Sequence, residues 1–377
     1  MSDASTEQSP RLKRLLGFVA RDPGNPALLA DAAAAAYDDK AYDTAAELLE
    51  RHAAVAPLPL TLLNLTGLVA LARQRYSDAA AIFARLRADG GDDPAVKFNL
   101  AWSEAMKGAH REALDLLDDE TIAASPRAPS LKIQMMHHLN LYDEALACGE
   151  ALARRFPGDE ALMGALATLA LDAEKSELAL HYARRAGSNA EGTAALGILT
   201  LGEHDVAGSL DLFEQALAKQ PANPRAWVGK GLALLMSNDA AAGATAIDRG
   251  AELFGDHLGS WIASGWAHFV TGDYVKARAS FERALAIDPN FAESHGGLAV
   301  LDVLAGNLDD ARRRSEIALR LDRTCLGGAL AKSLLLERGG HAQAAQKIRQ
   351  VALSMPIGAN GQTIAQALVG FSSGLRK

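Results

Sequence analysis

The sequence predicts an all-α protein built as a solenoid of antiparallel helix pairs. A pattern of small, aromatic and proline residues recurs every 34 residues along most of the 377-residue chain. Alanine is abundant and aromatic residues make up only 5% of the chain, which suits helices that pack closely together. Runs of Val, Ile and Thr with a period of two, the usual sign of strands, are lacking. We therefore expect no sheet.

The pattern is clearest in one 34-residue stretch, 258–291. Positions 4, 8, 20, 24, 27 and 32 of this stretch are occupied by Trp261, Gly265, Ala277, Phe281, Ala284 and Pro289. The small residues at positions 8 and 20 let two helices approach closely, so we expect Ala277 to face Gly265 across the pair. The aromatic residue at position 24 is expected to fill the gap toward the next pair.

The turn and the end of this stretch have simple causes. Gly272 can end the first helix in the left-handed conformation, and Asp273 can cap the second helix. Pro289 cannot continue a helix and so ends the second one. This spacing is the signature of the tetratricopeptide repeat, and the stretch closely resembles that family. The resemblance implies helix-turn-helix units that stack into a right-handed superhelix, and it favours a binding function over an enzymatic one.

The same register predicts ten repeats over residues 26–359. Their first residues are Pro26, Leu60, Pro94, Pro126, Glu160, Ala190, Pro224, Leu258, Ala292 and Leu326. The fifth repeat has only 30 residues, so we expect a short second helix or connection there. Terminal repeats of a solenoid must cover an apolar face. We accordingly predict an N-terminal helix from a partial repeat over residues 10–25 and a C-terminal capping helix over residues 360–377. Residues 1–9 are polar and are expected to be disordered.

Charge and composition set expectations for partners and location. A net charge of -8 argues against nucleic acid and anionic membranes, which need clustered cations. We therefore expect no nucleic-acid partner. No apolar run approaches the ~20 residues needed to span a bilayer, so we expect no membrane insertion. Cys148 and Cys325 show no repeated spacing and are expected to be free thiols of a cytoplasmic protein. The Ala-, Leu- and Arg-rich usage suggests a bacterial source.

Motifs of catalysis and cofactor binding are lacking. The chain has no G-x-G-x-x-G after a strand, no G-x-x-x-x-G-K-[ST], no H-E-x-x-H and no G-x-S-x-G. His137 and His138 are adjacent, and adjacent helical residues point about 100° apart, so the two rings do not readily share one ion. We predict no catalytic residue, no metal and no cofactor.

The resemblance also implies where a partner binds. In this family the first helices of successive repeats line a concave face through repeat positions 2, 5, 6, 9, 12 and 13. At such positions the candidate partner-binding residues are Phe98, Asn99, Trp102, Met106, Arg127, Gln134, His137, His138, Trp266 and Phe269. Aromatic residues at positions 9 and 12 can instead pack between helices. That alternative is favoured for Trp266 and Phe269 and stays open for Trp102.

One subtype of the family can be tested by position. Chaperone adaptors of this family hold a C-terminal carboxylate with Lys and Asn at positions 5 and 9, followed by Asn at position 6 of the next repeat. Here Asn99 occupies position 6, but the preceding repeat has Asn64 and Leu68 at positions 5 and 9, and the following repeat has Leu131 at position 6. We therefore expect no binding to heat-shock chaperone tails.

The leading functional hypothesis is a non-enzymatic scaffold or adaptor that binds a protein or peptide on its concave face. The alternative is an accessory subunit that presents a peptide substrate to a separate modifying or secretion enzyme. A third possibility is an enzyme with an unrecognised site.

Overall fold

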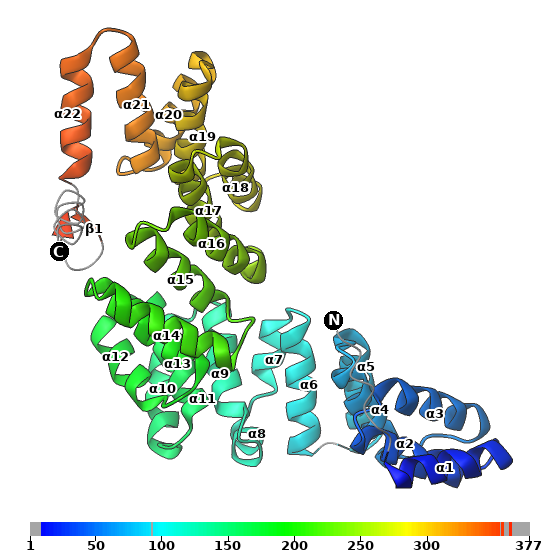
Figure 1. Ribbon diagram of the computed structural model, residues 1–377. Helices are drawn as coiled ribbons and strands as arrows, with labels where there is room; N and C mark the ends of the chain where they lie inside the picture. The colour runs from blue at the N-terminus through cyan, green and yellow to red at the C-terminus, as the bar shows by residue number, and fades with distance from the viewer. Residues whose placement is uncertain (1–8, 92, 355, 358–361, 364–377) are drawn as a thin grey trace. The chain divides into compact units, whose positions relative to one another are not determined.

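The computed structural model describes residues 9–91, 93–354, 356–357 and 362–363, and within them the chain is almost wholly helical. Its all-α character and its construction from consecutive helix pairs are confirmed (Figure 1). One short ladder departs from the expectation of no sheet: β1 (Pro356–Ile357) pairs in antiparallel fashion with β2 (Gln362–Thr363). It follows the last helix at Pro356, a residue that cannot continue a helix. Residues 364–377, most of the predicted capping helix, and residues 1–8 of the predicted disordered N-terminus lie outside the described residues.

The chain divides into two compact bodies, Met1–Leu162 and Met163–Lys377. The helices of the N-terminal body are α1 (Pro10–Arg21), α2 (Pro26–Asp38), α3 (Tyr42–Val55), α4 (Leu60–Ala72), α5 (Tyr76–Ala88), α6 (Pro94–Met106), α7 (His110–Asp115), α8 (Asp119–Ala124), α9 (Ala128–His138) and α10 (Tyr142–Arg155). The helix α11 (Glu160–Asp172) begins at the end of this body.

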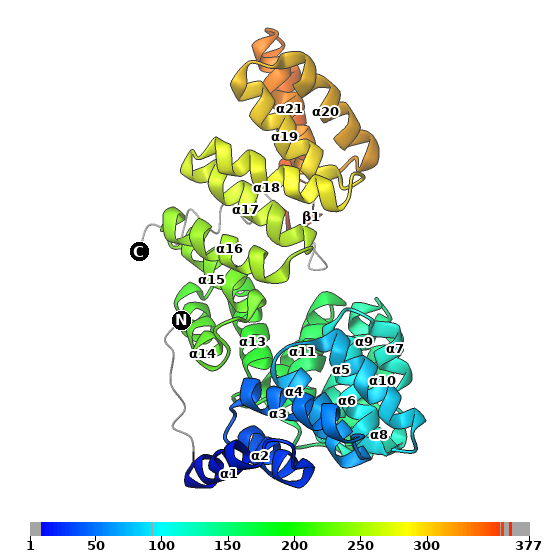
Figure 2. The same cartoon turned by 90° about the vertical axis from the view of Figure 1, so that its right-hand side faces the viewer.

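The C-terminal body continues the alternation of first and second helices (Figure 2). Its remaining helices are α12 (Ser176–Arg185), α13 (Ala190–Gly202), α14 (Val206–Lys219), α15 (Pro224–Met236), α16 (Ala240–Phe254), α17 (Leu258–Thr271), α18 (Tyr274–Ile287), α19 (Ala292–Ala305), α20 (Leu308–Leu321), α21 (Leu326–Arg338) and α22 (Ala342–Leu353). The division of the whole chain into ten repeats stays a prediction.

Several first helices begin with the same local chemistry. Pro26, Pro94 and Pro224 occupy the first turns of α2, α6 and α15. Proline suits that position because its fixed φ is helical and its missing N–H has no helical partner there. The residue before each proline, Asn or Asp, accepts hydrogen bonds from backbone N–H groups of the first turn. Each of these helix starts is therefore set by two adjacent residues.

The turn after each first helix contains one residue in the left-handed conformation. These positive-φ residues are Lys40, Gln74, Gly108, Asn140, Glu174, His204, Asn238, Gly272, Gly306 and Gly340. The backbone closes around them as in a Schellman motif: at the first turn, for example, Ala41 N donates to Ala36 O at 2.8 Å. This bond satisfies a carbonyl that the helix leaves without a partner. The turn geometry therefore recurs even at the six positions where glycine is absent.

Phenylalanine rings packed on glycines form much of the core between repeats. Phe281 is fully buried and lies against both Gly265 of its own pair and Gly297 of the next. A Cβ at Gly265 would lie 2.5 Å from the Phe281 ring. The same arrangement places Phe213 between Gly197 and Gly229. Gly265 thus faces the Phe281 ring, and Ala277 belongs to the same buried cluster as that ring. The expectation that Ala277 also faces Gly265 stays a prediction.

The repeat that begins with α6 is irregular. Two six-residue helices, α7 and α8, take the place of one long second helix. Asp118 causes the break: its carboxylate accepts from the backbone N–H of Thr121 at 2.8 Å and caps α8. The same N–H and the Thr121 hydroxyl lower the pKa of Asp118 to about 2, because both hydrogen bonds favour the charged form. The next first helix, α9, begins at Ala128, after this extra turn.

Candidate partner-binding site

Two aromatic side chains share one face of α6. Phe98 and Trp102 are four residues apart, so they lie on the same side of the helix. Their ring centroids are 6.2 Å apart at an interplanar angle of 40°. Both side chains are half-buried. Met106, one further turn along, is 41% exposed. Successive turns of α6 therefore present a continuous apolar stripe.

Arg127 joins this stripe from the next repeat. It precedes α9, and its guanidinium carbon lies 4.0 Å from the centroid of the Trp102 ring. This is a cation–π contact, in which the negative face of the indole attracts the cation. We refer to Phe98, Trp102, Met106 and Arg127 as the aromatic site. Three of these residues, Phe98, Trp102 and Arg127, lie in contact although they come from two repeats, and their role in binding a partner stays a prediction.

The other candidates on α6 and α9 lie beside this site without belonging to it. Asn99 is half-buried, and its backbone carbonyl accepts from Ser103 Oγ at 2.7 Å. Gln134 is also half-buried. His137 and His138 form part of a separate cluster at the end of α9.

The histidine cluster is built around a stacked pair. The rings of His110 and His138 are 4.4 Å apart and nearly parallel, at 10°. His137 contacts the edge of Tyr142 at 5.7 Å. Partial burial of the ring lowers the pKa of His138, although the residue as a whole is exposed, and the nearby charges of His110 and His137 lower it further. Sequence reasoning did not identify His110, which begins the helix after the turn and so meets the end of α9 only in the folded chain.

Trp266 and Phe269 lie in the C-terminal body and pack against other side chains. The Trp266 ring lies 5.3 Å from Phe281 and 5.4 Å from Phe269, in both cases edge to face. Both residues also pack against the buried cluster that contains Ala299 and Val300. These contacts match the packing alternative considered for the two residues.

One buried network has the composition of a hydrolytic triad but a different connectivity. Asp248 accepts from Ser264 Oγ at 2.6 Å and lies 2.8 Å from Nε2 of His268. Ser264 also contacts the Ser280 hydroxyl at 2.8 Å and is fully buried. A nucleophilic serine needs a histidine base within hydrogen-bond reach, whereas here the carboxylate stands between the two. The network links α16, α17 and α18 through side-chain hydrogen bonds. Among the described residues, no three His, Cys, Asp or Glu side chains are grouped to hold a metal ion.

Comparison with known protein families identifies the repeat. Two tetratricopeptide repeat models match the sequence, one over residues 271–324 and the other over residues 64–129, 194–257 and 237–292. Together these segments span more than half of the chain. The chain is a tetratricopeptide repeat protein. No curated protein matches its sequence.

Solved structures with a similar fold include complexes of IFIT1. The human IFIT1 dimer with m7Gppp-AAAA superposes with a TM-score of 0.53 at 11% identity, over 93% of this chain and 96% of that chain. The human IFIT1 dimer with PPP-AAAA gives a TM-score of 0.54 at 12% identity, over 94% and 95%. A monomeric IFIT1 mutant with Gppp-AAAA gives a TM-score of 0.54 at 11% identity, over 92% and 95%. At this identity the likeness of the tetratricopeptide repeat protein to IFIT1 is one of fold.

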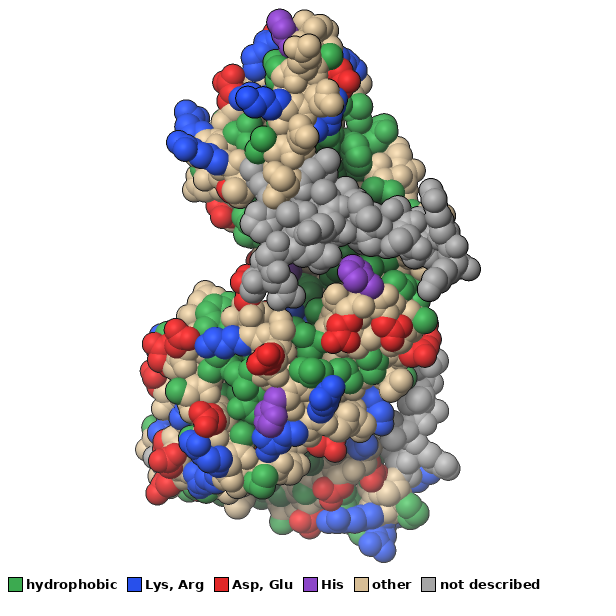
Figure 3. Space-filling view, turned by 90° about the vertical axis from the view of Figure 1, so that its left-hand side faces the viewer, with side chains coloured by type: hydrophobic (Ala, Val, Ile, Leu, Met, Phe, Trp, Pro, Cys, Tyr) green, Lys and Arg blue, Asp and Glu red, His purple; other side chains and the backbone are tan. Residues whose placement is uncertain are grey.

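These structures correct one expectation. The net charge led to the prediction of no nucleic-acid partner, and this exclusion is wrong, because structures of the same fold hold capped or triphosphate RNA. Net charge sums over the whole chain, whereas binding depends on the few cations that face a ligand. Figure 3 shows acidic and basic side chains interspersed on one face of the protein. Within the described part of the chain, no helix has both the length and the apolar character required to cross a membrane.

Proposed function

We propose that this tetratricopeptide repeat protein is a non-enzymatic scaffold or adaptor that binds a polypeptide segment at the aromatic site. The observation that carries the proposal is the meeting of Phe98, Trp102 and Arg127 across two repeats, next to the exposed Met106. Tryptophan and arginine are the side chains that most often dominate protein interfaces. The site combines both with an adaptable methionine.

The chemistry of the site suits an apolar side chain next to a carboxylate. Trp102 and Phe98 offer large, rigid surfaces whose burial costs little side-chain entropy. Stacking holds the guanidinium plane of Arg127 over the indole, and its N–H groups remain able to form a bidentate pair with a carboxylate. A partner segment that places an apolar residue on Trp102 and an acidic residue beside Arg127 would use both features.

The proposed setting is the bacterial cytoplasm. Cys148 and Cys325 are both free thiols, which fits a reducing compartment. The proposal of a non-enzymatic role is supported by the connectivity of the Asp248 network, in which the serine lacks a contacting base.

A polypeptide is favoured over an oligonucleotide at this site. An oligonucleotide binds through stacked bases together with several cations along its backbone, whereas the aromatic site includes one cation, Arg127. The exposed methionine beside it offers flexible apolar contact, which suits aliphatic and aromatic side chains.

Photo-crosslinking tests the proposal with a matched control. A photoreactive amino acid replaces Met106, which is 41% exposed, or Leu304, which is 42% exposed and lies in the C-terminal body. In cells of the native host, we expect a polypeptide adduct at position 106 that disappears when Trp102→Ala is added, and no such adduct at position 304. Mass spectrometry identifies the adducts. Equal adducts at both positions, an oligonucleotide adduct, or none at position 106 would contradict the proposal. A partner that includes a modifying or secretion enzyme would indicate the substrate-presenting role.

A further inference from the structure

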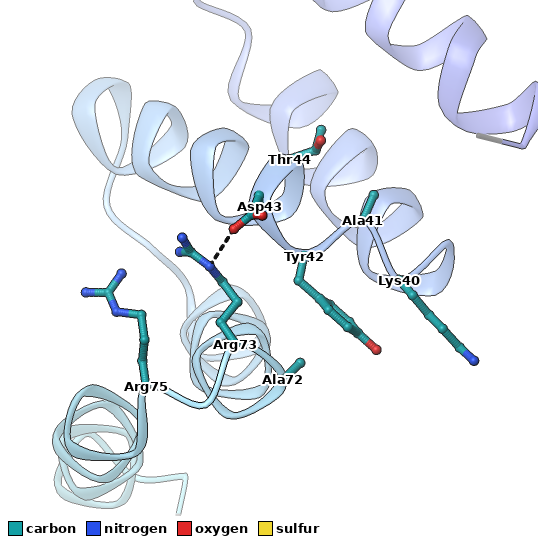
Figure 4. A pocket seen from close by; sticks show the side chains of 8 residues that line it. All are labelled: Lys40, Ala41, Tyr42, Asp43, Thr44, Ala72, Arg73 and Arg75. Carbon is teal, nitrogen blue, oxygen red and sulfur yellow. Dashed lines mark ion pairs between the residues drawn. The ribbon is translucent and has the colours of Figure 1, made fainter. Parts of the chain in front are cut away.

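A pocket of about 600 Å³ lies between the turn that joins α2 to α3 and the turn that joins α4 to α5 (Figure 4). Its lining consists of Lys40, Ala41, Tyr42, Asp43, Thr44, Ala72, Arg73 and Arg75. All of these residues belong to, or directly adjoin, the turns that join α2 to α3 and α4 to α5. The pocket therefore lies at the turn edge of the repeats and contains none of the residues of the aromatic site.

A second hollow of about 350 Å³ extends this edge to the third turn. It shares Arg75 with the first pocket and is also lined by Gln74, Tyr76, Ser77, Asp78 and Lys107. We call Lys40, Arg73, Arg75 and Lys107 the basic strip. Three successive turns contribute to it, so its cations follow the direction in which the repeats stack.

Each of the two arginines pairs with one carboxylate through its Nε atom. Arg73 Nε lies 2.8 Å from Asp43 Oδ1, and Arg75 Nε lies 2.6 Å from Asp78 Oδ2. Within the described part of the chain, neither arginine makes a hydrogen bond through its terminal Nη atoms. Figure 4 shows the guanidinium groups of Arg73 and Arg75 on one side of the pocket, while Lys40 extends the other way. Both guanidinium groups thus keep the two N–H groups that suit bidentate binding of an anion.

The lining supplies many more hydrogen-bond donors than acceptors. The two guanidinium groups, the two ammonium groups and the hydroxyls of Tyr42, Thr44, Tyr76 and Ser77 can all donate. The ammonium of Lys107 already pairs with Glu104 Oε2 at 2.7 Å, so Lys40, Arg73 and Arg75 supply most of the free donors. An extended polypeptide offers the complementary pattern, since each residue has a backbone carbonyl and each Asp or Glu adds a carboxylate.

We propose that the basic strip binds an extended, acidic segment of a polypeptide, with Arg73 and Arg75 pairing with its carboxylates. A polynucleotide fits the strip less well. The Tyr42 ring contacts Tyr37 at 5.7 Å, which limits its use as a stacking surface for bases.

Fluorescence anisotropy with a labelled oligo-glutamate peptide tests this site directly. We expect the intact protein to bind the peptide at low salt. The double variant Arg73→Gln, Arg75→Gln should weaken binding by about tenfold, because two charge-assisted contacts are lost. Asp43→Asn should strengthen binding, because it removes the carboxylate that competes for Arg73.

The matched control is Arg312→Gln, Arg313→Gln, which removes the same charge elsewhere. These side chains are 60% and 68% exposed and pair with Asp309 and Asp310 in the same turn of their helix. Binding should be unchanged in this control, and circular dichroism should show equal helicity in all variants. If the double variant Arg73→Gln, Arg75→Gln does not fold, the change in peptide binding caused by Asp43→Asn tests the proposal instead. Equal weakening in the control, tighter binding of an oligoadenylate of equal net charge, no binding of oligo-glutamate, or weaker binding by Asp43→Asn would each overturn the proposal.

Discussion

At the scale of single residues, His138 makes the stability of the folded protein depend on pH. Its ring stacks on His110 at 4.4 Å, and burial together with the neighbouring histidines lowers its pKa below the ordinary value of 6.5. Below pH 6.5 the unfolded chain therefore binds more protons at this residue than the folded chain does. The stability that the neutral ring contributes is fully present above pH 6.5 and is lost as the pH falls toward the lowered pKa.

The pH dependence of thermal unfolding tests this effect. The melting temperature of the intact protein should fall as the pH drops below 6.5, and His138→Gln should reduce that fall because the variant cannot bind the extra proton. His341→Gln, which changes a histidine of the last helix pair, is the control and should keep the full pH dependence. If the melting temperatures of His138→Gln and the intact protein fell equally with pH, the stacked histidine pair would not be the cause of the pH dependence.

A second residue-scale effect arises at the turns. Glu174 adopts φ of 57°, a left-handed conformation that is unfavourable for a residue with a Cβ. Glu174→Gly should therefore raise the free energy of unfolding by about 1 kcal/mol, although the greater freedom of glycine in the unfolded chain opposes part of the gain. Chemical denaturation measures the change. Glu47→Gly, in the interior of α3, should lower stability by about 1 kcal/mol. Destabilisation by both changes would mean that the turn imposes no strain.

At the scale of helices, the packing of phenylalanine on glycine determines how closely paired helices approach. Gly265→Ala would place a Cβ 2.5 Å from the Phe281 ring and should cost on the order of 1–3 kcal/mol. Phe281→Leu should itself destabilise the protein, but adding Gly265→Ala to it should cost much less than in the native chain, because the crowding ring is gone. Denaturant titrations of the four proteins give the coupling free energy directly.

A second glycine, Gly17, is a control at which substitution by alanine is expected to raise stability and not lower it. Gly17 lies on the exposed side of α1, and a Cβ there would meet nothing within 4 Å. Gly17→Ala should raise stability by about 0.5–1 kcal/mol, because alanine loses less backbone freedom in a helix. If Gly265→Ala behaved like Gly17→Ala, the close packing of α17 and α18 on Phe281 would be wrong.

Some features of the helices could be predicted from the sequence and others could not. The spacing of Pro, Gly and aromatic residues predicted helix pairs because each of these residues acts locally, at a cap, a turn or a close contact. It also named Phe98, Trp102 and Arg127, which contact one another in the structure, as candidates for a binding surface that is still untested. The break between α7 and α8 was not predicted, because it depends on the side-chain hydrogen bonds of Asp118. The basic strip was missed because its cations lie at turns, outside the first-helix positions that the family resemblance brought into consideration.

At the scale of the whole molecule, a repeat architecture means that a change in one repeat affects stability mainly near that repeat, and that ligands can bind at more than one place along the chain. Each repeat contacts mainly its neighbours, so damage to one pair should spread outward and leave distant pairs folded. For the same reason, the N-terminal body can carry both proposed ligand surfaces, the aromatic site on α6 and α9 and the basic strip at the turns. A net charge of -8 describes neither surface, and this is why it failed to exclude nucleic acid.

Trp102 is proposed to bind the partner and not only to pack within the fold. The decisive measurement is the affinity of Trp102→Ala for the partner segment captured at position 106, determined by calorimetry and accompanied by thermal unfolding of the same sample. We predict a loss of roughly 2 kcal/mol or more in binding free energy, with the melting temperature unchanged and with Arg312→Ala binding as the intact protein does. An unchanged affinity per folded molecule, whether or not the melting temperature falls, would show that Trp102 only packs and would contradict the account.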